Sequence, residues 1–131
     1  MTSQVAFTAE AAGGNPTAGS AITFSTVITN IGSAYDGTDT FICPADGIYA
    51  FTVTLMGQDE SDNTDASIYV NGGQTSRIHG HTDGQNIQAS NSVVVFCPAG
   101  GTVYVRANNG GYIYPGAEST FSGVLIGITA A

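Results

Sequence analysis

The sequence predicts an all-β fold, a sandwich or jelly roll of short antiparallel strands. Apolar and polar residues alternate in short runs along the chain, as expected for strands with one buried face. Gly, Asn, Asp and Pro separate these runs, and Gly accounts for 18 of the 131 residues. We find no convincing helical spacing of apolar residues. Many short strands with turn signals between them are typical of two packed sheets.

At least eight strands are expected. Side chains alternate across a strand, so the runs 22–28 and 49–55 should each turn one apolar face to the core. The residues expected on those faces are Ile22, Phe24, Thr26 and Ile28 in the first run and Tyr49, Phe51, Val53 and Leu55 in the second. The other predicted strands are 5–7, 40–43, 66–70, 92–96, 102–107 and 120–128, with loops at 11–20, 57–65 and 80–85.

A hairpin is predicted at Asn71-Gly72. This pair follows the apolar run that ends at Val70 and precedes residues 74–78. Asn and Gly both adopt the positive φ angles of a tight two-residue turn. The two flanking segments should therefore pair as neighbouring antiparallel strands.

The charge balance limits the possible partners. The chain has 2 Lys+Arg against 10 Asp+Glu and a formal net charge of -8, which argues against binding to nucleic acid or to anionic membranes. No run approaches the ~20 apolar residues of a spanning helix. A hydrophobic content of 42% is enough for a core, and the length fits one domain over residues 1–131. Residues 1–4 lack the features of a secretory signal, so we expect a cytoplasmic chain or a mature form.

The two cysteines leave their redox state open. Cys43 and Cys97 lie on or beside predicted strands. They are too few for a cysteine-built metal site. A single disulfide and a pair of buried thiols are both compatible with the sequence.

A run of aromatic and small residues resembles the globular head domain of complement component C1q. Asn30 follows Phe24 by six residues and Tyr35 comes five later, and the segment Gly47-Ile-Tyr49-Ala-Phe51 follows. Similar stretches recur at 65–72, 92–95, 101–105 and 119–123, so the resemblance spans residues 5–128. The chain departs from the pattern where Val53 replaces a common aromatic, and it has no collagen-like Gly-X-Y segment.

This resemblance implies a jelly roll of about ten strands, shared with tumour necrosis factor and assembled as a homotrimer. It also implies secretion, which would make this chain a stalkless mature head. The function implied is lectin-like recognition of carbohydrates on cell surfaces in innate immunity, with acetylated or sialylated sugars as candidate ligands. The alternative is a protein-binding module, which engages a receptor or a matrix component, because one fold serves many uses.

An acidic loop is a candidate calcium site. Asp59, Asp62 and Asp65 concentrate oxygen ligands within seven residues, and Ca²⁺ takes six to eight oxygens. The loop lacks the spacing of an EF-hand. A solvated acidic loop that maintains solubility is the simpler interpretation. No other cofactor is predicted.

The cations and histidines are candidate ligand contacts. Arg77 lies near a loop, followed by His79 and His81, and an arginine is the simplest partner for an acidic group on a ligand. Two histidines alone do not make a specific metal site, and such residues are also ordinary loop surface. Arg106 shares a predicted strand face with Tyr104, and we interpret it as a structural anchor, through an ion pair or a hydrogen bond, at a contact between subunits.

The segment 108–116 is a second candidate contact with sugar. It combines amides with phenol rings, which suit the hydroxyl groups and C–H faces of sugars. The predicted contacts are Asn108, Asn109, Tyr112 and Tyr114. A plain turn with its tyrosines packed on the edge of the sandwich is equally compatible with the sequence.

Catalysis is not predicted. The chain contains no Gly-x-Ser-x-Gly, no His-Glu-x-x-His and no phosphate-binding loop. Its acidic residues lie mostly in predicted loops, with no pairing that the sequence establishes. We therefore predict a binding protein and not an enzyme.

Overall fold

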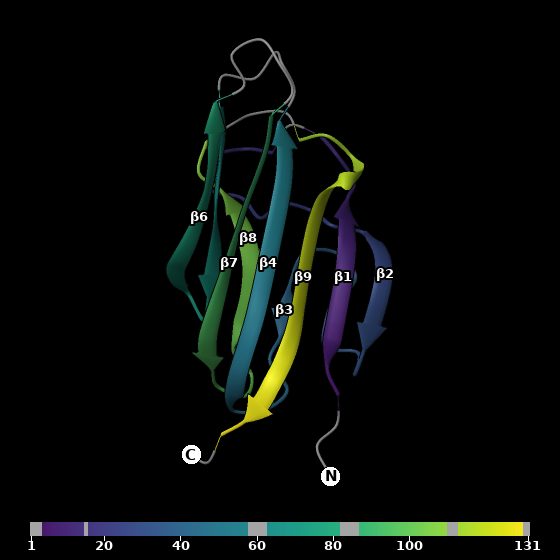
Figure 1. Ribbon diagram of the computed structural model, residues 1–131, viewed down its shortest axis with the longest axis vertical. Helices are drawn as coiled ribbons and strands as arrows, with labels where there is room; N and C mark the ends of the chain where they lie inside the picture. The colour runs from purple at the N-terminus through teal and green to yellow at the C-terminus, as the bar shows by residue number, and fades with distance from the viewer. Residues whose placement is uncertain (1–3, 15, 58–62, 82–86, 110–112, 130–131) are drawn as a thin grey trace.

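Two antiparallel sheets pack face to face in the computed structural model (Figure 1), which describes residues 4–14, 16–57, 63–81, 87–109 and 113–129. One sheet has the order β2-β1-β9-β4-β7 and the other β3-β8-β5-β6. The strands are β1 (Ala6–Ala11), β2 (Thr26–Ile31), β3 (Phe41–Ile42), β4 (Gly47–Gly57), β5 (Asn63–Val70), β6 (Gly73–His81), β7 (Ile87–Cys97), β8 (Thr102–Ala107) and β9 (Gly116–Ile128). Across these ranges no helix is long and apolar enough to cross a membrane.

The predicted strands exist, and most are longer than their sequence runs. The strand β8 has the predicted bounds. The strands β1, β5 and β6 extend into segments that the sequence predicted as loops. The hairpin at Asn71-Gly72 is confirmed, with Val70 opposite Gly73 and φ angles of 50° and 85° at the two turn residues. Polar residues at the ends of these strands belong to the sheet because they pair with a neighbouring strand. The composition of the segments does not predict that pairing.

Aromatic rings fill the space between the two sheets. Phe7 stacks on Tyr35 at a centroid distance of 4.7 Å and meets Phe121 edge-on at 4.8 Å. Phe51 contacts Phe41 edge-on at 5.4 Å. Tyr49, Phe51, Val53 and Leu55 are all fully buried, as the alternation in β4 predicted. Offset and edge-on ring contacts add about 0.5–1.5 kcal/mol each beyond area burial.

The residues that carried the resemblance hold this core together. Asn30 donates from Nδ2 to the Tyr35 carbonyl at 2.8 Å and accepts from the Tyr35 N–H at 3.3 Å. The Tyr35 hydroxyl donates to the Phe24 carbonyl at 2.5 Å, and the Tyr49 hydroxyl donates to the Ala45 carbonyl at 2.6 Å. Burial raises the pKa of both phenols, so they remain protonated donors.

The expected core face of run 22–28 is wrong in its second half. Ile22 and Phe24 are buried, but Thr26 and Ile28 are exposed. The strand β2 begins only at Thr26 and lies at the edge of the five-stranded sheet. Alternation fixes which residues share a face, but the position of the strand in the sheet decides whether that face is covered.

Cys43 and Cys97 are fully buried free thiols. Burial, and next a hydrogen bond with Cys97, raises the pKa of Cys43, and burial also raises the pKa of Cys97. A protonated buried thiol is a poor nucleophile. The pair therefore acts here as small core residues.

Gly123→Ala should destabilise the fold by about 1–3 kcal/mol, because overpacking a filled core forces rings out of position. A Cβ at Gly123 would lie 2.5 Å from Phe51 Cδ1 and 2.8 Å from Phe7 Cε1. Gly127→Ala on the same strand is the control, since its Cβ would meet nothing within 4 Å. Urea unfolding of the two variants tests this, and equal midpoints would contradict it.

Candidate functional site

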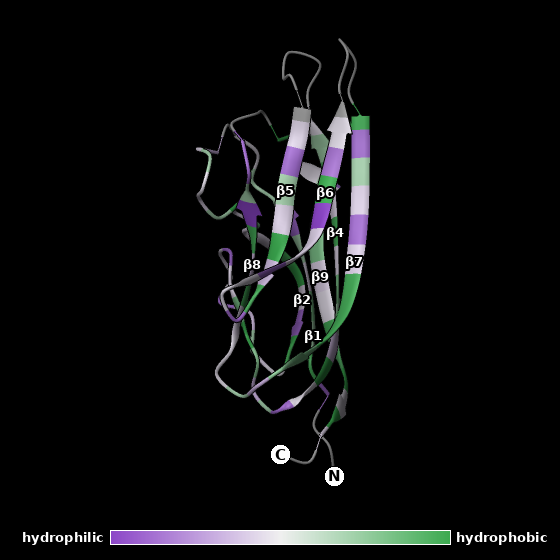
Figure 2. Cartoon of the chain, turned by 90° about the vertical axis from the view of Figure 1, so that its left-hand side faces the viewer, coloured by the Kyte–Doolittle hydropathy of each residue, from purple (hydrophilic) through white to green (hydrophobic). Residues whose placement is uncertain are grey.

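The outer face of the four-stranded sheet carries a polar and aromatic surface. Ala66, Ile68 and Val70 of β5 point into the core, so the alternate residues Asp65, Ser67 and Tyr69 point outward. Figure 2, which faces the edge of the sandwich where β6 and β7 lie, shows hydrophilic and hydrophobic bands alternating along β5 and β6. Residues from three neighbouring strands therefore meet on one rigid surface.

Asp65 and Arg77 form an ion pair on this face. Asp65 accepts from Arg77 Nε at 2.8 Å and from a terminal Arg77 nitrogen at 2.5 Å, which is a bidentate geometry. The Arg77 hydrogen bonds, and next the Asn108 amide, hold the pKa of the Asp65 carboxyl below its ordinary value, although partial burial opposes them. His79 lies directly opposite Asp65 in the strand register. The charge of Arg77 is thus already matched within the chain.

A hydrogen-bond network links this pair to the centre of the sheet. Asn108 Nδ2 donates to Asp65 Oδ1 and to Ser67 Oγ, both at 2.9 Å. Gln74 Nε2 also donates to Ser67 Oγ, at 2.8 Å. Ser67 is fully buried although it points outward, because these side chains cover it. The network fixes the amides of Asn108 and Gln74 in place.

Arg106 lies on the same face without a carboxylate partner among the residues that the structure describes. Its guanidinium carbon is 5.2 Å from the centre of the Tyr69 ring, and its Nη1 donates to the Tyr69 hydroxyl at 3.4 Å. Tyr69 stacks on Tyr104 at 5.6 Å. Ser67 pairs with Arg77 on β6 and with Arg106 on β8, so both arginines of the chain lie in one row across the sheet.

Sequence reasoning identified part of this site. It placed Tyr104 and Arg106 on one face of residues 102–107, but it interpreted Arg106 as a structural anchor. Tyr69 was not predicted as a site residue. The register that sets Tyr69 beside Tyr104 joins positions 35 residues apart, and nothing in the local pattern indicates that pairing.

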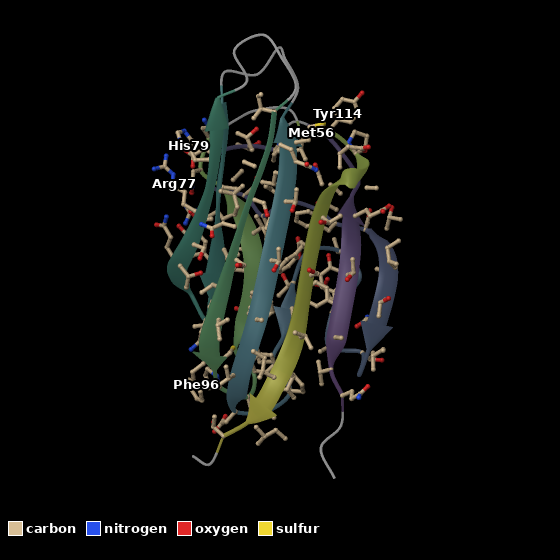
Figure 3. All side chains as sticks on the ribbon, viewed as in Figure 1. Met56, Arg77, His79, Phe96 and Tyr114 are labelled. Carbon is tan, nitrogen blue, oxygen red and sulfur yellow. The ribbon has the colours of Figure 1, made fainter. Side chains whose placement is uncertain are left out.

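The predicted site residues do not all come together. Arg77, His79 and Asn108 gather on the outer face of the four-stranded sheet around Asp65. Figure 3 shows Arg77 and His79 on β6 at one side of the molecule, with Tyr114 near Met56 at the upper end, away from them. The Tyr114 N–H donates to the Met56 carbonyl, which holds that segment against β4. Asn109 follows Asn108 and is partly buried.

Several predicted contacts lie outside the described part of the chain. Asp59, Asp62 and Tyr112 are not described, and of His81 only the backbone is described, as the end of β6. Within the described ranges no group of three His, Cys, Asp or Glu is arranged to hold a metal ion. Asp65, the third expected calcium ligand, directs its carboxylate to Arg77 and Asn108. Calcium binding at the acidic loop stays a prediction.

The outer face of the five-stranded sheet has a different character. Register across the five strands aligns an apolar row, Ile31, Ala6, Val124, Ala50 and Val94. The next row consists of the hydroxyl residues Thr29, Thr8, Ser122, Thr52 and Ser92. A hollow of about 300 Å³ lies over these two rows. Val94 is 67% exposed, and Phe96 and Ile126 extend the apolar end of the face.

A family model for the C1q domain matches residues 6–126. This chain belongs to the C1q domain family. Complement C1q tumor necrosis factor-related protein 3 of Mus musculus is 32% identical over 126 residues, and the Homo sapiens protein of that name is 31% identical. Each match covers 94% of this chain and 51% of the relative, so the chain spans about half the length of these curated relatives.

Solved structures share the fold of this C1q domain. The globular domain of zebrafish complement 1qA protein superposes with a TM-score of 0.78 at 15% identity, covering 95% of this chain and 99% of the other. Murine APRIL at pH 5.0 gives 0.80 at 9% identity over 94% and 99%. Eiger TNF from S. frugiperda gives 0.78 at 11% over 99% and 97%. The predicted all-β jelly roll is confirmed.

Arg77→Gln should raise the pKa of Asp65 toward 3.8, because the variant removes its main partner. Since the folded-state pKa lies below that ordinary value, ionised Asp65 stabilises the fold above about pH 4, and this contribution is lost as the pH falls through the lowered pKa. Carboxyl-carbon NMR titration measures the change.

Asp36 is the internal control for that titration. Burial raises its pKa, but the N–H groups of Thr38, Asp39 and Thr40 lower it to a net depression. Its titration should be the same in both proteins. An unchanged Asp65 in the variant would mean that the pair with Arg77 does not form in solution.

Proposed function

We propose that this C1q domain is a secreted, trimeric, lectin-like recognition module without catalytic activity. It assembles through the outer face of the five-stranded sheet and binds carbohydrate on the outer face of the four-stranded sheet. The single observation that carries the proposal is the contrast between these faces, one apolar and hydroxyl-rich, the other lined with amides, phenols and both arginines.

The five-stranded face suits contact with further copies of the chain. Its exposed apolar residues are Ile31, Val94, Phe96, Val124, Ile126 and Ile128. Contiguous exposed apolar patches commonly mark interaction surfaces. The rows beside them contain small hydroxyl side chains, which allow close approach and can pair across an interface. The family resemblance supports three copies.

The four-stranded face suits a polyhydroxylated ligand. Asn108 and Gln74 present exposed amides that the Ser67 network orients, and Tyr69 and Tyr104 present phenols. Amides and hydroxyls match the donors and acceptors of sugar hydroxyl groups. Assembly through the opposite sheet would leave this face accessible on every subunit. Three such sites on one particle would favour closely spaced glycans on a cell surface.

A second candidate function is binding to a protein partner, such as a receptor or a matrix component. Ile42 on β3 is 47% exposed, on a strand outside the rows assigned to assembly. An exposed isoleucine suits a protein contact more than a sugar contact. Pull-down from native fluid separates the two functions, because simple sugar releases a glycan partner and leaves a protein partner bound.

Val94→Glu should convert the assembly to single chains of 13.3 kDa, because three carboxylates would be buried in an apolar contact. Light scattering after gel filtration measures the mass. Ile42→Glu introduces the same charge at an exposed apolar position on the other sheet, and it should leave the trimer intact. A wild-type protein of 13.3 kDa at every concentration would refute the trimer.

The trimer should bind an immobilised glycan saturably, and Val94→Glu should weaken that binding by roughly 10²–10⁴-fold, since avidity requires linked sites. Affinity for the free monovalent sugar should stay the same in this variant. A glycan array identifies the ligand, and calorimetry with the free sugar gives the affinity of one site. Absence of saturable binding to any glycan would overturn the lectin proposal.

A further inference from the structure

We propose that Arg106 binds the carboxylate of an acidic sugar on the outer face of the four-stranded sheet. The inference rests on the proposed function, because it names the ligand class of that same face. The nearest alternative cation is Arg77, which lies in the same row on the far side of Ser67. The different surroundings of the two arginines decide between them.

Arg77 is paired with a carboxylate of this chain, whereas Arg106 has no carboxylate partner among the described residues. Both Asp65 oxygens accept hydrogen bonds from Arg77, and that pair matches its charge. Among the described residues, Arg106 donates one hydrogen bond, to the neutral Tyr69 hydroxyl. A guanidinium has five N–H donors, so Arg106 keeps donors for a ligand. A partly buried cation without an anion gains most from binding one.

The guanidinium of Arg106 is also held in position. It lies over the Tyr69 ring at 5.2 Å, and Tyr69 is itself stacked on Tyr104. Gly19 also lies close to the guanidinium, since a Cβ at Gly19 would be 3.5 Å from Arg106 Nη2. Ala21 pairs with Arg106 in an isolated β-bridge, which holds the segment containing Gly19 beside β8. A pre-positioned guanidinium loses little freedom when it binds a planar carboxylate.

The neighbours of Arg106 indicate a sugar as the bearer of the carboxylate. Ser67 lies opposite Arg106 in the register, beneath the Asn108 and Gln74 amides that it anchors. The Tyr69 hydroxyl lies beside the guanidinium. These neutral donors and acceptors lie beside a guanidinium that has no carboxylate partner among the described residues, which is the pattern expected for a ligand with one anionic group and several hydroxyls.

The net negative charge of the chain makes the positive charge of Arg106 unusual on this surface. The chain has a formal charge of -8 and only two arginines, so most of its surface repels anions. Arg77 on β6 and Arg106 on β8 lie on opposite sides of Ser67, with β5 between them. Asp65 offsets one of the two positive charges. The charge of Arg106 has no such partner among the described residues, so an anionic ligand would supply it.

Calorimetric titration of the 131-residue protein with the α-methyl glycoside of N-acetylneuraminic acid, and with methyl glucuronide, tests the proposal. The uncharged partners are the methyl ester of the first probe and methyl glucoside for the second. We expect each acid to bind at least tenfold more tightly than its uncharged partner. Arg106→Gln should abolish that preference. Arg106→Lys, which keeps the charge and loses the planar fork, should reduce it several-fold.

A charge-matched control accompanies these variants. Ser25→Glu, at an exposed position just before β2, changes the net charge by the same amount as Arg106→Gln and should leave affinity unchanged. Thermal unfolding checks that each variant is folded. If Arg106→Gln does not fold, Tyr69→Phe replaces it, because it removes only the hydroxyl that holds Nη1 and should weaken acid binding.

The outcomes separate this inference from the proposed function. Equal affinity for charged and uncharged sugars, unaffected by Arg106→Gln, overturns the inference and leaves a neutral-sugar lectin. Loss of acid binding in Arg77→Gln but not in Arg106→Gln also overturns it. Binding of an acidic peptide but of no sugar overturns both proposals. Failure of every sugar and every glycan on the array overturns the proposed function itself.

Discussion

The absence of a side chain at Gly123 lets the rings of its two neighbours in the five-stranded sheet, Phe7 on β1 and Phe51 on β4, pack over β9. β9 lies at the centre of the five-stranded sheet, between β1 and β4, and at Gly123 it has no side chain on its inner face. A Cβ there would overlap both Phe51 and Phe7. The rings can therefore lie directly on the strand and fill the gap of roughly 10 Å that packed sheets leave. From these positions Phe7 contacts Tyr35 and Phe121, and Phe51 contacts Phe41 of the other sheet.

The residues that identify the C1q domain family are mostly residues of this core. Asn30 fixes Tyr35, and Tyr35 reaches across to the Phe24 carbonyl. A Cβ at Gly47 would lie 2.7 Å from the Gly127 carbonyl oxygen, so this position requires glycine. Asn30, Tyr35 and Gly47 determine how the sandwich closes, and none of these three lies on the outer face of the four-stranded sheet. Membership of the family therefore specifies the scaffold, and the ligand depends on the outward-facing residues.

The sequence predicts those parts of the fold that depend on local pattern. Alternation predicted the buried face of β4, and Asn71-Gly72 predicted its turn, because both signals reside in neighbouring residues. The exposure of Thr26 and Ile28 depends on β2 being an edge strand, which only the sheet order reveals. The same limit applies to the site. The pairing of Arg77 with Asp65, and of Arg106 with Tyr69, depends on long-range register.

A surface built on strand faces differs from one built on loops in how its side chains are held. The positions of Ser67, Arg77 and Arg106 follow from three hydrogen-bonded strands, so no flexible segment sets the separation of the two cations. Of these two cations, only Arg77 has an anionic partner among the residues described. Preorganisation of this kind is the property that a recognition surface requires.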